Sequence, residues 1–231
     1  MRRSIALAAL SVLALGTAQA SAQSVTFDFE DGTDQGFGTG FGNDASMNFP
    51  IDNIGGSLRM RVVNTNSFQE AGRESGANGS PFFLAMAAAA ANEAGYVLSY
   101  DWYVDTTLTN NPGGFLQLGT YVNTGSGYYA QDFPAIKDVE LNGTQLASGQ
   151  VFSGTVSETF AAKGFDMPPN GGNPTPETFL RVGFIVNAGT DTNAVVHFDN
   201  ITIAPVPEPA SLALLALAVP ALVVRRRGTP D

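Results

Sequence analysis

The chain has no cysteine, one histidine and one tryptophan among its 231 residues. The absence of cysteine excludes thiol catalysis, zinc–thiolate centres and disulfides, so packing, or a bound ion, must stabilise the fold. The single histidine, His197, leaves no zinc–histidine motif and lies inside an expected strand, which favours a structural role. No nucleophile elbow is present, and the glycine-rich segment 36–42 lacks the lysine and following hydroxyl of a phosphate-binding loop. The sequence therefore argues against an enzyme.

Basic residues are also scarce, with 11 Lys and Arg against 21 Asp and Glu and a formal net charge of -10. Since nucleic-acid binding depends on clustered cations that neutralise phosphates, nucleic acid is not an expected partner. The acidic surplus has two interpretations: solubility outside a cell, or coordination of calcium by carboxylate and carbonyl oxygens. Paired carboxylates also hydrolyse glycosides, but the sequence does not show which pair would face a cleft, so a glycoside hydrolase is the least favoured alternative.

Long helical periodicities are missing, and a period-two alternation of apolar and polar residues is present instead. It predicts strands over residues 24–30, 56–63, 96–104, 114–122, 136–141, 150–160, 179–187 and 194–203. Segments rich in Gly, Asn, Pro and Ser separate them at 32–48, 64–80, 110–114 and 167–176. The expected fold class is all-β, an antiparallel β-sandwich with jelly-roll topology favoured. For the alanine-rich run 85–91, a helix, an apolar strand and a packed loop all stay open.

On three of the expected strands the alternation separates an apolar face from a mixed face. The apolar faces carry Tyr96, Leu98, Tyr100, Trp102 and Val104, then Leu116, Leu118, Thr120 and Val122, then Leu180, Val182, Phe184 and Val186. The mixed faces carry Ser99, Asp101 and Tyr103, then Phe115, Gln117 and Tyr121, then Phe179, Arg181, Ile185 and Asn187. We assign Trp102 to the core, because it shares its face with Leu98 and Val104.

The first 22 residues have the pattern of a secretory signal peptide. Arg2 and Arg3 precede an apolar segment over residues 5–15, and small-x-small cleavage patterns end at Ala20 and Ala22. Cleavage after Ala22 is preferred, and the alternative differs by two residues. We therefore expect an exported chain with one β-sandwich domain over residues 23–204.

The C-terminal segment, residues 205–231, combines a proline-flanked motif, an apolar run at 210–224 and an arginine cluster. The motif is Val206, Pro207, Glu208 and Pro209, and the cluster is Arg225, Arg226 and Arg227. The run is shorter than the ~20 residues that usually span a bilayer, and the arginines favour the cytoplasmic side. An ordinary C-terminal anchor and a buried core helix are the alternatives.

This combination resembles the PEP-CTERM sorting signal of Gram-negative bacteria. The resemblance implies processing by an exosortase, initial anchoring in the cytoplasmic membrane through the C-terminal helix, and delivery to the cell surface or the medium. It also implies a role in exopolysaccharide and biofilm formation, in which Glu208 and its prolines are recognition residues.

The segments 27–37 and 197–203 resemble the opening and closing strands of jelly-roll carbohydrate-binding modules. In that family a structural calcium lies between these two neighbouring strands. The resemblance implies Glu30 and Asp199 as metal ligands, with Asp28 or a carbonyl near Gly32 as weaker additions. Calcium takes about six to eight oxygens, which carboxylates from both ends of the domain and loop carbonyls can supply. The alternative is that these acids are solvated charges at strand edges and turns.

A polysaccharide site needs flat aromatic rings on which sugar rings stack, and polar groups that bind the sugar hydroxyls. The candidates on the mixed faces are Asp101, Tyr103, Gln117, Tyr121 and Arg181, with Tyr128 and Tyr129 in addition. They form a site if their strands adjoin; an outer sheet face or a second packed layer is the alternative. The favoured function is a non-catalytic domain that binds extracellular polysaccharide. The alternative function is a structural matrix protein that acts through protein contacts.

Overall fold

The computed structural model of the protein describes residues 23–39, 51–63, 68–74, 79–108, 114–124, 127–132, 135–165, 180–189 and 193–207. The predicted signal peptide, and the sorting segment from Glu208 onward, lie outside these residues. Within the described ranges, no helix has both the length and the apolar character needed to cross a membrane.

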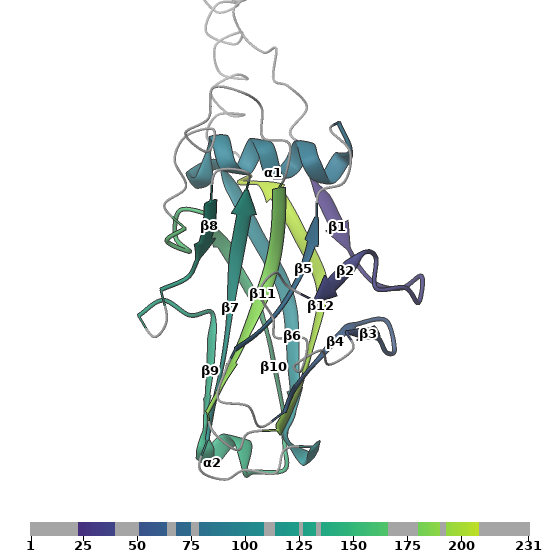
Figure 1. Ribbon diagram of the computed structural model, residues 1–231, viewed down its shortest axis with the longest axis vertical. Coiled ribbons are helices and arrows are strands. Elements are labelled where there is room, and N and C mark those ends of the chain that lie inside the picture. Colours follow the sequence, from purple (N-terminus) through teal and green to yellow (C-terminus); the bar gives the residue numbers. More distant parts are fainter. Residues whose placement is uncertain are drawn as a thin grey trace, which may run out of the picture.

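The described strands form two antiparallel sheets that pack face to face (Figure 1). Sheet A has the order β10–β6–β12–β4–β3, and β1 pairs with the second half of β12. Its strands are β1 (Val25–Phe27), β3 (Asp52–Asn53), β4 (Leu58–Val63), β6 (Tyr96–Asp105), β10 (Val151–Thr159) and β12 (Asn193–Pro205). The fold is therefore a β-sandwich, as the alternation predicted.

Sheet B has the order β2–β5–β11–β7–β8, and β9 continues the edge by pairing with the first half of β7. Its strands are β2 (Phe37–Thr39), β5 (Phe68–Glu74), β7 (Phe115–Thr124), β8 (Gly127–Ala130), β9 (Val139–Asn142) and β11 (Leu180–Ala188). Short 3-10 turns, η2 (Glu93–Gly95) and η3 (Thr106–Leu108), flank β6. Consecutive strands such as β10, β11 and β12 therefore alternate between the two sheets.

The core lies between the sheets and is dominated by aromatic rings. Phe184 of sheet B stacks on Phe198 of sheet A with ring centroids 4.3 Å apart, and Tyr100 meets Phe184 edge-on at 4.9 Å. The apolar faces expected for 96–104, 114–122 and 179–187 point inward where they are described, and Trp102 is partly buried against the core. Such contacts add about 0.5–1.5 kcal/mol per aromatic pair beyond the area they bury.

Helix α1 (Pro81–Ala91) covers one end of the sandwich, and the short α2 (Gly143–Leu146) lies at the other (Figure 1). Ser80 accepts a hydrogen bond from the Phe83 N–H, and Pro81 occupies the first helical turn, where its missing N–H costs nothing. The helix buries Phe82, Phe83, Ala85 and Met86. Of the three alternatives left open for the alanine run, the helix is the one that the chain adopts.

All eight expected strands are present, with ends that differ by a few residues. Four further strands, β2, β3, β5 and β8, were not expected. β2 and β5 lie inside segments 32–48 and 64–80, which were interpreted as turns. These strands form because they pair with partners distant in sequence, so tertiary hydrogen bonding outweighs the turn-forming composition.

Candidate functional site

The five residues proposed to bind a ligand lie on opposite sides of the sandwich, so they do not form one surface. Asp101 and Tyr103 project from β6 on the outer face of sheet A. Gln117, Tyr121 and Arg181 project from β7 and β11 on the outer face of sheet B. The three strands that carry these residues do not all adjoin, because β6 belongs to sheet A whereas β7 and β11 are neighbours in sheet B.

A row of glycines crosses the outer face of sheet B. Gly38, Gly72 and Gly183 are paired in register on β2, β5 and β11, and Tyr121 continues the row on β7. A Cβ at Gly183 would collide with the Tyr121 ring, and one at Gly72 would collide with the Tyr121 hydroxyl and the Arg181 side chain. The glycines therefore allow a tyrosine ring and a guanidinium to lie close against the sheet.

Arg181 holds the Tyr121 ring in this position. Its Nε donates to the Tyr121 hydroxyl at 2.9 Å, and its Nη2 donates to the carbonyl oxygens of Gly38 and Gly72 at 3.3 Å each. Both side chains are buried, with Tyr121 only 1% exposed. Burial raises the pKa of Tyr121 to about 12, so the phenol is neutral at ordinary pH. Tyr121 is thus a fixed support for whatever lies on top of it.

Tyr128 of β8 is the group that lies on Tyr121. The two rings stack with centroids 5.2 Å apart and an interplanar angle of 26°, and Tyr128 is 45% exposed. The Tyr128 hydroxyl donates to the Glu70 carboxylate. Burial raises the pKa of Glu70, while this hydrogen bond and Arg181 act in the opposite direction. The half-exposed Tyr128 ring is therefore held in its orientation by the Tyr121 ring beneath it and by the Glu70 carboxylate at its hydroxyl.

Amide side chains lie farther along the same face. Asn187 of β11 donates to the Gln117 oxygen at 2.9 Å, and Gln117 donates to Glu140 of β9 at 3.3 Å. Asn187 is half-buried, so part of its surface faces solvent. Glu70 was not proposed from the sequence, because its segment was interpreted as a turn; only the pairing of β5 with β11 places it beside Tyr128.

On the outer face of sheet A, the polar groups pair with one another. Tyr103 stacks on His197 with centroids 4.0 Å apart, and the Tyr103 and Ser57 hydroxyls lie 2.7 and 2.8 Å from His197 Nδ1. Arg59, next in the row, donates from Nε to Asp52 at 2.7 Å. Burial, with help from Arg59, lowers the pKa of His197 to about 4, so the imidazole is neutral at pH 7.

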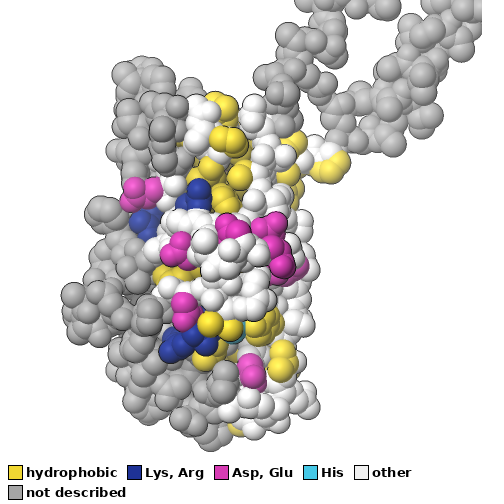
Figure 2. All heavy atoms as spheres, turned by 90° about the vertical axis from the view of Figure 1, so that its right-hand side faces the viewer, with side chains coloured by type: hydrophobic (Ala, Val, Ile, Leu, Met, Phe, Trp, Pro, Cys, Tyr) yellow, Lys and Arg dark blue, Asp and Glu magenta, His cyan; other side chains and the backbone are white. Residues whose placement is uncertain are grey.

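Four carboxylates gather at the edge of the sandwich near β1. Burial raises the pKa of Asp199, and the nearby Asp101, Glu30 and Asp28 charges add to the effect. Figure 2 views the edge that carries β1, β2 and β3 and shows acidic side chains concentrated there. Asp101 is also bound to the side chains of Thr155 and Asn200, at 2.5 and 2.9 Å. The acids that follow β1 are thus neighbours of Asp199 on β12.

The backbone is strained around these acids. Phe29, Gln35 and Asn200 are the described non-glycine residues with positive φ, at 55°, 48° and 49°. Asn200 lies where the register of β12 shifts beside Asp199. As placed, the described ranges contain no group of three or more His, Cys, Asp or Glu side chains arranged to hold a metal ion.

No protein-family model matches the chain, and no curated protein matches it in sequence. Solved structures do match in fold. A carbohydrate-binding module specific for non-crystalline cellulose, CBM28, is 17% identical, with a TM-score of 0.43, over 75% of this chain and 90% of that one. A family 30 carbohydrate-binding module is 12% identical, with a TM-score of 0.41, over 80% and 89% of the two chains.

A third match is the K3 adhesin domain of Lys-gingipain from Porphyromonas gingivalis, at 16% identity and a TM-score of 0.35, over 78% of this chain and 98% of that one. Each of these values describes a likeness of overall architecture and assigns no ligand to this chain.

Proposed function

We propose that the domain binds polysaccharide on the outer face of sheet B and does not catalyse a reaction. The observation that carries the proposal is the stacked pair in which the buried Tyr121 supports the half-exposed Tyr128. Sugar rings stack their C–H faces on flat aromatic rings, and a ring that is already fixed loses little entropy on binding. Half-buried Asn187, held by its hydrogen bond to the buried Gln117, supplies an amide group for sugar hydroxyls on the same face.

Binding fits this face better than catalysis does. The Glu70 carboxylate is engaged by the Tyr128 hydroxyl. His197 lies on the other sheet, neutral and stacked on Tyr103. A catalytic acid or base must reach its substrate, and both of these side chains are buried, Glu70 being 3% and His197 6% exposed.

The decisive experiment is affinity electrophoresis of the chain in gels that contain the producing organism's exopolysaccharide, soluble cellulose derivatives or xylan. Tyr128→Ala should weaken binding about tenfold, because a fixed aromatic contact of this kind is worth about 1.4 kcal/mol. Tyr103→Ala is the matched control, since it removes the same side chain from the opposite face. Circular dichroism melts establish that both variants fold.

Retardation that is lost in Tyr128→Ala and kept in Tyr103→Ala supports the site on sheet B. The reverse pattern would move the site to sheet A. Normal mobility of the unaltered chain in every gel would contradict glycan binding, and self-association in sedimentation experiments would then favour the matrix protein that acts through protein contacts.

We also propose a structural calcium at the acidic edge, held by Glu30 and Asp199 with help from Asp28. The support is the mutual repulsion of these acids, which a cation would relieve, and a buried oxygen, Gln35 Oε1, that has no hydrogen-bond partner among the described residues. Gln35 Nε2 donates to Asp28 at 3.2 Å, so this amide lies beside the proposed ligands. Small movements of the side chains are required, because the acids do not converge as placed.

The calcium proposal is tested by thermal melting. The melting temperature should be higher in millimolar calcium than in chelator, because an ion that binds only the folded state stabilises it. Identical melting temperatures in the two buffers would contradict calcium binding.

For the fold, we propose jelly-roll connectivity. Its support is the alternation of consecutive strands between the sheets, as in β4 to β5, β6 to β7, and β10 to β11 to β12. A solved structure that traces the connections through residues 40–50 and 166–179 would test it.

For location, we propose that the chain is exported by its N-terminal signal and sorted by an exosortase through the motif at 206–209. The support is the sequence pattern at both ends of the chain. Replacing Glu208, or deleting residues 210–231, should change membrane retention and processing. Identical fractionation of the variants and the parent chain would contradict the assignment.

A further inference from the structure

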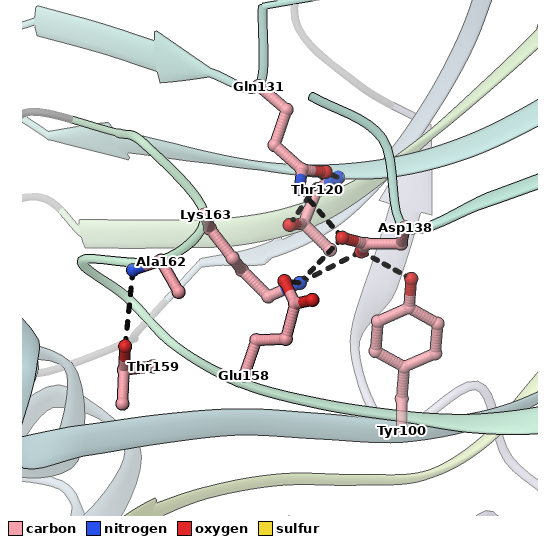
Figure 3. A network of polar contacts seen from close by, with 8 residues as sticks. All are labelled: Tyr100, Thr120, Gln131, Asp138, Glu158, Thr159, Ala162 and Lys163. Atoms are coloured by element: carbon pink, nitrogen blue, oxygen red, sulfur yellow. Dashed lines mark hydrogen bonds and ion pairs between the residues drawn. The ribbon is translucent and has the colours of Figure 1, made fainter. Parts of the chain in front are cut away.

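A lysine and an aspartate form a fully enclosed pair between the two sheets (Figure 3). Lys163 lies in the turn after β10, and Asp138 directly precedes β9. Both side chains are 0% exposed. Lys163 Nζ lies 2.9 Å from each Asp138 carboxylate oxygen, so it faces the carboxyl group from close by.

Each oxygen of the Asp138 carboxylate also receives a second donor. The Tyr100 hydroxyl, from sheet A, donates to Oδ2 at 2.5 Å, and Gln131 Nε2 donates to Oδ1 at 2.6 Å. The Gln131 oxygen accepts in turn from the Thr120 backbone N–H at 2.7 Å, which fixes the amide. Burial and Asp138 raise the pKa of Tyr100 well above its ordinary value, so the hydroxyl keeps its proton.

A second carboxylate lies near the amine. Glu158 Oε2, on β10, is 3.9 Å from Lys163 Nζ, and the Glu158 side chain is 46% exposed. The pair therefore has a neighbouring acid that can carry a proton between the dry interior and solvent. One enclosed site thus contains an amine, a carboxyl group, donors to both carboxyl oxygens and a proton carrier.

An ordinary buried ion pair is weak evidence of stability, because removing both charges from water costs several kcal/mol. The arrangement here also holds close together the two groups that amide formation joins. Because Nζ is equally close to both oxygens, it lies near the carboxyl carbon, within the roughly 3–3.5 Å from which reacting atoms combine. We propose that Lys163 Nζ and Asp138 Cγ join in an intramolecular isopeptide bond that cross-links the two sheets.

The reaction needs no co-reactant. A proton passes from the ammonium of Lys163 to the carboxylate of Asp138, which leaves a neutral amine and a carboxylic acid. The amine lone pair forms the C–N bond at Cγ, and the donors Tyr100 and Gln131 stabilise the charge that develops on oxygen. Glu158 takes a proton from nitrogen and returns it to the departing hydroxyl. The C–O bond breaks, and one amide and one water result.

The cross-link would give a cysteine-free chain the covalent tie that a disulfide supplies elsewhere. It would join the turn that follows β10 of sheet A to the connection between β8 and β9 of sheet B. The bond would stabilise the fold by constraining the unfolded chain. Because it is an amide, this stabilisation would not depend on the redox state of the surroundings.

Mass spectrometry of the denatured, trypsin-digested full chain tests the proposal. The chain has two lysines, Lys137 and Lys163, so the relevant digest is simple. An amide at Lys163 blocks cleavage there. We expect a fragment that runs from Asp138 to Arg181 and is lighter than its sequence by one water. A linear fragment 138–163 of unaltered mass would overturn the proposal.

Two variants complete the test. Lys163→Arg should restore the full sequence mass, because a guanidinium is a poor nucleophile, whereas Lys137→Arg should keep the loss of water. The masses of the tryptic fragments also distinguish the cross-link from a loss of water elsewhere in the chain. A water lost at Asp31, which precedes a glycine, would lower the mass of a different fragment and would count against the cross-link.

Discussion

The single histidine should make the folded domain less stable in mild acid. The His197 ring is 6% exposed, stacks on Tyr103 and lies beside the Arg59 guanidinium. Burial first, and then Arg59, lower the pKa of His197 from its ordinary value of 6.5 to about 4. The acids Asp52 and Asp105 oppose this effect but do not cancel it. The folded state therefore excludes a proton that the unfolded chain binds.

The magnitude follows from the separation of the two pKa values. Because the unfolded chain binds more protons between pH 6.5 and about pH 4, the free energy of unfolding falls as the pH falls through this window. At ~1.4 kcal/mol per pKa unit, the full loss is about 3 kcal/mol, of which about 2 kcal/mol is lost at about pH 5. Below about pH 4, His197 contributes no further change.

Urea unfolding of the parent chain and of His197→Gln between about pH 7 and about pH 4 measures this contribution. Carboxylates titrate in both proteins, so the difference between the two slopes of unfolding free energy against pH gives the contribution of the imidazole. Because the chain has one histidine, its NMR titration is unambiguous and should have a midpoint near pH 4. Parallel loss of stability in the two proteins, or a midpoint near 6.5, would refute the reasoning.

Three further predictions concern other parts of the structure. Gly183→Ala should lower the unfolding free energy by about 1–3 kcal/mol, because the new Cβ meets the Tyr121 ring, whereas Gly38→Ala in the same row meets no atom within 4 Å and should be nearly neutral in urea melts. Lys163→Met should cost about 3–5 kcal/mol, since it removes the proposed cross-link and leaves the Asp138 carboxyl group buried without its partner, and a loss below about 1 kcal/mol would contradict this. Asp199→Asn should raise the melting temperature in chelator, by relieving repulsion among the acids, and should abolish any shift caused by calcium.

Much of the fold could be predicted because the core is built on alternation. Every second residue of β6, β7 and β11 enters the interior, and the side-chain period of a strand fixes that pattern locally. The edge strand β2 and its neighbour β5 could not be found this way, since glycines and polar residues dominate them and they form by pairing with distant partners.

The candidate site was only partly predictable for the same reason. Tyr121, Arg181 and Gln117 were identified because aromatic, charged and amide side chains alternate with apolar ones on β7 and β11. Glu70 was missed together with its strand. Asp101 and Tyr103 were grouped with the others although β6 belongs to the opposite sheet.

The sequence by itself determined the all-β class, the identity of the inward-facing residues and the acidic, cysteine-free character of the chain, because composition and side-chain period are local properties. Only the tertiary structure decided which strands are neighbours. It separated Tyr103 from Tyr121, seated Tyr128 on Tyr121 over a row of glycines, and enclosed Lys163 with Asp138 between the sheets. Strand pairing joins residues far apart in the chain, and no local pattern encodes those distances.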